Sequence, residues 1–228
     1  AYAFTTLTVI PGMLDYKQAK IQILDVPGIV SGAASGKGRG RETLNVILNA
    51  DLVLVVVDVT HPEHYPAIMK EVWDSNIRLN RTKPEVFIKK KAYGGINIGK
   101  TVPLDLDDDT LKKILREFKK MNVDVLISSP VDVDSFIDVI EGNKKYVPAI
   151  TCLTKADIVN TARLDKVKKE LNADIFISAE KDLNIEPLKE LIFEKMDFMR
   201  ICMKEPKKDA DTEKPLIIKR GSTIGGVC

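Results

Sequence analysis

The stretch KIQILDVPG, residues 20–28, decides the fold: an apolar run rich in β-forming residues stops at the carboxylate of Asp25 and at a Pro-Gly turn. This pattern predicts a strand with Asp25 at its C-terminal end. In a doubly wound α/β sheet, ligands bind in the crevice beyond the carboxyl ends of the strands. There, an Asp-x-x-Gly pattern suits a phosphate ligand, because Asp25 can hold Mg²⁺ through water and the Gly28 amide can donate to a terminal phosphate. The pattern alone is weak, since an isolated acid before a turn is often a capping or turn residue.

The composition is that of a soluble globular protein. The 228 residues are 44% hydrophobic and 30% charged, and the 35 basic and 33 acidic residues leave a net charge of +2, which favours no particular partner. No apolar run is long enough to span a membrane, and we expect no signal peptide. The three cysteines are odd in number and unclustered, so we expect a cytoplasmic protein. The chain starts without methionine and stops soon after a new apolar run begins, so we expect both ends to be cut.

The order of apolar runs predicts an α/β fold with a mostly parallel sheet. Near-continuous apolar runs are typical of parallel strands covered on both faces, and they occur at residues 51–58, 147–153 and 173–177. Helical spacing alternates with them, at residues 65–76, 164–171 and 185–203. Near the N-terminus, two β-rich runs flank Pro11 and Gly12 and predict a long hairpin that turns there.

A different pattern fills residues 77–146, which we expect to form an inserted α+β subdomain. The order expected is two short strands, a helix over residues 110–121, a strand over 123–128 and a helix over 136–140. Acidic residues precede both helices. Because acids at a helix N-terminus complement its dipole, capping is a better explanation for them than a metal site.

Two short motifs predict a site that reads guanine. Thr154-Lys155-x-Asp157 follows one predicted strand: the carboxylate can accept N1–H and the exocyclic amino group, while the lysine stem packs along the base. Adenine offers no such pair of donors and would leave the carboxylate unpaired. After the next strand, residues 178–180 (Ser-Ala-Glu) can supply a backbone amide to the guanine carbonyl. Each motif is weak by itself, but each follows a predicted strand in the order that a guanine-nucleotide site requires.

These motifs resemble those of translation-factor-class GTPases, most closely the DRG (developmentally regulated GTP-binding) branch of the Obg family. Further shared motifs lie along nearly the whole chain: YAFTTLT at residues 2–8, GKGRGR at 36–41, IRLN at 77–80, KKK at 89–91, GGI at 94–96, TVPL at 101–104 and DVIEGN at 138–143. The resemblance implies a P-loop-NTPase-type G domain that binds GTP or GDP with Mg²⁺.

The resemblance also implies roles for individual residues. Thr6 would be the switch I threonine that binds Mg²⁺, with Thr5 the weaker choice, and Asp25 and Gly28 would belong to switch II. Thr6 and Asp25 would therefore bind the metal, and Thr6 and Gly28 would act in catalysis. The guanine-reading set would be Thr154, Lys155 and Asp157, assisted by Ser178, Ala179 and Glu180.

The resemblance divides the chain into five segments. Residues 1–76 and 147–204 would form the two parts of the G domain, and residues 77–146 a subdomain similar to part of a small-subunit ribosomal protein. Residues 205–214 would be a linker. Residues 215–228 would begin a TGS domain.

The sequence departs from the family pattern at two places. Ile29 stands where many GTPases carry a water-orienting glutamine, so we expect slow hydrolysis that needs a backbone group, a cation such as K⁺ or a partner. The phosphate-binding loop that precedes switch I in the family is missing from the chain. Residues 94–101 do fit the formula G-x-x-x-x-G-K-T, but they alternate like a strand and lie after Asp25 in the chain, so we do not expect them to bind phosphate.

The sequence therefore predicts a GTPase switch in translation, acting with the ribosome or RNA and with a regulatory protein. In the alternative, the chain is an RNA- or ribosome-binding module with a vestigial nucleotide site. That role would be carried by residues 89–91 (Lys-Lys-Lys) and Tyr93, although a lysine run is more often a solvated surface. Without the phosphate loop, we expect this chain to bind nucleotide weakly and to hydrolyse it undetectably.

Overall fold

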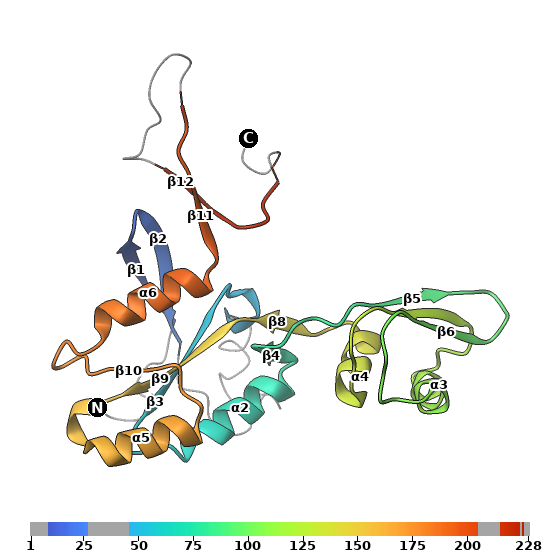
Figure 1. The fold of residues 1–228 in the computed structure, drawn as a ribbon, viewed down its shortest axis with the longest axis horizontal. Helices are drawn as coiled ribbons and strands as arrows, with labels where there is room; N and C mark the ends of the chain where they lie inside the picture. The colour runs from blue at the N-terminus through green and yellow to red at the C-terminus, as the bar shows by residue number, and fades with distance from the viewer. Residues whose placement is uncertain (1–8, 27–45, 205–214, 224, 226–228) are drawn as a thin grey trace. The chain divides into compact units, whose positions relative to one another are not determined.

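A computed structural model describes residues 9–26, 46–204, 215–223 and 225 (Figure 1). The chain divides into two compact units. Residues 1–75 and 147–228 belong to the first unit, and residues 76–146 belong to the second unit. No helix among the described residues is both long and apolar enough to cross a membrane.

The first unit is built on a parallel sheet with the strand order β10-β9-β3. Its strands are β3 (Val53–Asp58), β9 (Ala149–Thr154) and β10 (Ile175–Phe176). The first five residues of β9 are buried, as a near-continuous apolar run predicts for a central parallel strand. Helices α2 (His64–Asp74) and α5 (Thr161–Glu170) lie on one side of the strands, and α6 (Ile185–Lys195) lies on the other (Figure 1). This is the α/β arrangement expected from the sequence.

A hairpin of β1 (Ile10–Tyr16) and β2 (Ala19–Asp25) packs on the same unit. The prediction that it turns at Pro11 and Gly12 is wrong, because the turn lies at Lys17 and Gln18, both with positive φ. The sequence lacks the Gly or Asn that usually marks such a two-residue turn. Contacts with α6 hold this turn instead: the Tyr16 hydroxyl donates to Glu190 at 2.7 Å, and Lys17 pairs with the same carboxylate.

The end of the first unit also differs from the prediction. The helix expected over residues 185–203 stops at Lys195, and β11 (Phe198–Ile201) follows and pairs antiparallel with β12 (Leu216–Lys219). Asp197, with a φ of 50°, separates the helix from the strand. The apolar residues keep a helical spacing beyond Lys195, so the sequence pattern did not reveal where the helix ends. The predicted linker over residues 205–214 lies outside the described part of the chain.

The second unit is an α+β fold with the sheet order β5-β7-β6. Strand β7 (Val123–Ile127) pairs antiparallel with β5 (Val86–Lys90) and parallel with β6 (Ile96–Lys100). Helices α3 (Asp108–Glu117) and α4 (Val133–Glu141) form a core with this sheet around the fully buried ring of Phe136. A separate short pair, β4 (Ile77–Leu79) and β8 (Lys145–Val147), lies where the chain enters and leaves the unit.

The acids ahead of these two helices act as caps, as the sequence predicts. The Asp107 carboxylate accepts from the Thr110 amide at 2.6 Å, and Asp132 forms a reciprocal capping box with Ser135. Both contacts satisfy amides that have no partner within the helix. The stretch at residues 94–101 contains strand β6 and opens no helix, so the structure gives it none of the geometry of a phosphate-binding loop.

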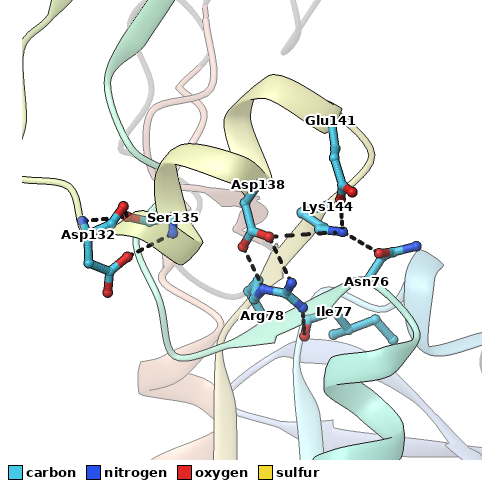
Figure 2. A network of polar contacts seen from close by, with 8 residues as sticks. All are labelled: Asn76, Ile77, Arg78, Asp132, Ser135, Asp138, Glu141 and Lys144. Carbon is cyan, nitrogen blue, oxygen red and sulfur yellow. Dashed lines mark hydrogen bonds and ion pairs between the residues drawn. The ribbon is translucent and has the colours of Figure 1, made fainter. Parts of the chain in front are cut away.

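A buried ion-pair network ties α4 to the strands at the entrance of the second unit (Figure 2). The Arg78 side chain donates to both oxygens of Asp138, at 2.6 and 2.8 Å, and the two side chains are only 4% and 5% exposed. Lys144 approaches the same carboxylate at 3.9 Å and also pairs with Glu141 and Asn76. Two cations therefore share one buried acid.

Candidate functional site

The carboxyl ends of β3, β9 and β10 meet at one edge of the parallel sheet. Register places Asp58 opposite Thr154, and the Ile177 amide, just after β10, donates to the Leu153 carbonyl at 2.8 Å. Both predicted guanine-reading motifs begin at this edge. Parallel strands bring their carboxyl ends together, so motifs far apart in the sequence become neighbours.

Thr154 and Lys155 are anchored on the end of β3. The Thr154 hydroxyl donates to the Val57 carbonyl at 3.3 Å, while Lys155 has a left-handed backbone with φ of 58°. Its ammonium group lies 2.6 Å from the Asp58 carboxylate. The lysine head is thereby held at the sheet edge, although nearly half of its side chain is exposed.

Asp58 is a residue of this edge that the sequence reasoning missed. Burial alone would raise the pKa of its carboxyl, but hydrogen bonds from Lys155 and Thr60 outweigh burial and lower the pKa to about 2. Thr60 contributes both its amide at 2.9 Å and its hydroxyl at 2.6 Å. The signal that could have found it is an acid that closes an apolar strand next to the strand that delivers a lysine.

Asp157 lies beside Ser178, which joins the two guanine motifs. The Ser178 side chain lowers the pKa of the Asp157 carboxyl, which, like other exposed aspartates, is ionised at neutral pH. Ser178 is buried, whereas Asp157 is exposed and open to a ligand. The Ala156 amide, next to Asp157, donates to the Ile177 carbonyl at 3.1 Å and fixes the two loops to each other.

The loop after β10 is closed by its own hydrogen bonds. Ser178 and Leu183 exchange backbone hydrogen bonds, and the Asn184 side chain donates to the Phe176 carbonyl at 2.9 Å. Ala179 and Glu180 are exposed within this closed loop. Both residues directly follow Ser178, whose side chain lowers the pKa of Asp157.

The remaining predicted site residues fall into two groups. Asp25 ends β2, where it is exposed opposite Ile10, and within the described residues no strand pairing joins β2 to the parallel sheet. Thr6 and Gly28, like Thr5 and Ile29, lie outside the described residues. The structure therefore brings together Thr154, Lys155, Asp157 and residues 178–180, and it leaves the phosphate and metal side of the predicted site undescribed.

Comparison with known proteins gives this geometry a family. Residues 1–91 match the family described as "50S ribosome-binding GTPase", and residues 93–198 match the C-terminal region of the same domain. A GTP-binding protein of Methanocaldococcus jannaschii is 45% identical over the whole chain, and developmentally-regulated G-protein 1 of Arabidopsis thaliana is 39% identical. Developmentally-regulated GTP-binding protein 1 of Xenopus laevis is 41% identical over 96% of the chain.

The chain belongs to the developmentally regulated GTP-binding (DRG) proteins. The resemblance drawn from its motifs is confirmed, and so is the GTPase fold class. This DRG chain covers 58–60% of the length of those three relatives. The family has a GTPase domain and binds guanine nucleotides.

Proposed function

We propose that this DRG chain contributes the guanine-reading half of a GTPase switch. The observation that carries the proposal is the hydrogen bond at 3.1 Å from the Ala156 amide to the Ile177 carbonyl, which joins the loop of Asp157 to the loop of Ser178 beyond the ends of β9 and β10. An exposed, ionised carboxylate can accept two parallel N–H donors, which guanine presents and adenine does not. Lys155 would pack along the base, Thr154 would brace the loop, and the amides of residues 178–180 would face the guanine carbonyl.

The phosphate side of the proposed site rests on sequence alone. Thr6 and Asp25 would hold Mg²⁺, since hydroxyl and carboxylate oxygens suit this hard cation, and Asp25 is exposed at its strand end. The Gly28 amide would donate to the terminal phosphate. Bound Mg²⁺ neutralises the charge of the phosphates during hydrolysis to GDP. Because Ile29 cannot orient water, turnover in the whole protein would be slow and would respond to K⁺ or to a regulatory partner.

The switch would act in the cytoplasm, in translation, with the ribosome or RNA as its partner. The family description "50S ribosome-binding GTPase" over residues 1–91 supports this proposal. Residues 77–146 would be an inserted subdomain similar to a ribosomal-protein domain, and residues 215–228 the start of a TGS domain. In the second candidate function, the chain binds RNA or the ribosome with a vestigial nucleotide site, and the lysine-rich surface of the second unit favours that candidate.

Comparing the binding of guanine and adenine nucleotides tests the guanine proposal directly. We expect the chain to bind fluorescent mant-GDP more tightly than mant-ADP. Asp157→Asn should weaken mant-GDP binding by about 30-fold, because an amide offers a donor where guanine also donates. The same variant should gain affinity for mant-XDP, because xanthine carries an acceptor carbonyl in place of the amino group. Asp165→Asn, an exposed acid on α5, is the control and should change neither affinity.

Equal binding of the guanine and adenine nucleotides, or an unchanged preference in Asp157→Asn, would contradict the proposal. The preference between bases is the decisive quantity, since weak phosphate contacts lower every affinity alike. Stimulation of GTP hydrolysis by K⁺ over Na⁺ in the whole protein would separately test the role given to the cation.

A further inference from the structure

The second unit carries two adjoining cavities, the first of which is rich in lysine. The first has a volume of about 350 Å³, and its lysines come from four separate segments: Lys83, Lys90, Lys120 and Lys144. The second has a volume of about 460 Å³ and shares Lys83, Asp138 and Tyr146 with the first. Because they share these walls, the two cavities form one groove, which we call the lysine groove.

The acid in this groove is already neutralised. Asp138 is the one acidic residue among those that line the first cavity, and it accepts two hydrogen bonds from the buried Arg78 guanidinium. Lys144 is paired with Glu141, as Figure 2 shows. These two pairs cancel in charge, so neither adds to the net charge of the groove.

The remaining three lysines carry uncompensated charge. Within the described part of the chain, Lys83, Lys90 and Lys120 form no ion pair, in contrast to Lys91 and Lys100, which each lie within 2.7 Å of an aspartate. The second cavity adds Arg81 and Glu85, whose opposite charges offset each other. A concave surface with an excess of three positive charges attracts and concentrates anions.

The size of the lysine groove and the aromatic ring that lines it indicate which class of anion it can bind. Each cavity has the volume of a small-molecule site, which admits single nucleotides and is too small for a double helix. Tyr146 is half-buried where the cavities meet, and an aromatic ring in a cationic groove offers a surface on which an unpaired base can stack. An acidic peptide would satisfy the lysines but would make no use of that ring.

We infer that the lysine groove binds the phosphodiester backbone of single-stranded RNA. Lys83, Lys90 and Lys120 pair with successive phosphates, and Tyr146 stacks with a base. The choice of RNA over other polyanions rests on the proposed role in translation, while the groove itself is independent of the nucleotide site. It also differs from the lysine run at residues 89–91, because Lys83 and Lys120 lie outside that run.

Fluorescence anisotropy of a labelled U12 RNA with the 228-residue chain, between 50 and 200 mM KCl, tests this inference. Binding to single strands weakens with salt with a slope of about −0.7 for each neutralised phosphate in a plot of log affinity against log salt. The variant Lys83→Gln/Lys90→Gln/Lys120→Gln should therefore bind about tenfold more weakly at 100 mM KCl, with a slope shallower by about 2. Its affinity for mant-GDP should stay unchanged, which separates failure here from failure of the nucleotide proposal.

A charge-matched variant controls for general electrostatics. Lys112→Gln/Lys113→Gln/Lys119→Gln removes the same charge from the second unit, at positions that do not line either cavity. It should keep at least half of the RNA affinity. An equal loss in both variants, or no loss in the groove variant, would overturn the inference.

Competitors distinguish RNA from other anions. Unlabelled U12 should displace the probe, whereas poly-L-glutamate at equal charge should not, and its success would make the groove an acidic-peptide site. Tripolyphosphate should compete only at concentrations at least 100-fold higher than U12. Equal potency would make the groove a small-polyphosphate site and would overturn the RNA assignment.

Discussion

Replacing Asp138 by alanine should destabilise the second unit by about 3–5 kcal/mol. The magnitude follows from burial: the Asp138 and Arg78 side chains are 5% and 4% exposed, and two hydrogen bonds join them. Removing one partner leaves the Arg78 guanidinium buried without its counter-charge, and breaking a buried pair typically costs this much. Lys144, 3.9 Å from the same carboxylate, would lose part of its compensation as well.

Hydrogen exchange of the α4 amides as a function of urea measures this cost within the second unit. Asp134→Ala is the matched control, because Asp134 is exposed in the first turn of the same helix and should cost less than about 1 kcal/mol. A double variant, Arg78→Met/Asp138→Leu, should recover most of the loss, since it removes both charges together. A loss in Asp138→Ala no larger than that of the control, or a double variant as unstable as the single one, would refute the reasoning.

Three further outcomes follow from the first unit. The pKa of Asp58 is lowered in the folded state, so its contribution of about 2 kcal/mol to the free energy of unfolding is present above pH 4 and lost toward pH 2. In urea unfolding, the difference in stability between the protein and Asp58→Asn should therefore disappear over that pH range. The hydrogen bond with Glu190 raises the pKa of Tyr16 to about 12, so Tyr16→Phe should remove a tyrosine that ionises near pH 12 in an absorbance titration. Burial raises the pKa of Cys152 to about 11. At pH 8, DTNB should therefore react quickly with the exposed Cys202, whereas Cys152 should react only when the protein unfolds. Fast labelling of Cys152 in the native protein would contradict its burial.

The sequence predicted those parts of the fold that depend on local pattern. The run at residues 149–154 is apolar throughout and became a central strand, and the acids before α3 and α4 became caps. The caps are local, because residues three positions apart supply the whole interaction, and the central strand is marked by its continuous run of apolar residues.

Contacts between distant residues explain what the sequence did not reveal. The hairpin turn at Lys17 and Gln18 depends on Glu190, more than 170 positions away, and the spacing of apolar residues alone could not show that α6 gives way to a strand at Phe198. In the candidate site, the Thr-Lys-x-Asp motif that contains Asp157 could be recognised from the sequence alone. The role of Asp58, which pairs with Lys155, was not evident, because it depends on which strand lies beside β9.

The second unit is closed at its own neck, where the Lys145 amide donates to the Asn76 carbonyl at 2.9 Å. About 90 residues separate the end of β3 from the start of β9. Once the second unit has folded, its closed neck leaves an effective loop of about 20 residues between the two strands. The shorter loop lowers the entropic cost of joining the two strands by about 1.4 kcal/mol. Early folding of the insertion would therefore accelerate assembly of the sheet whose strands β3 and β9 flank it in the sequence.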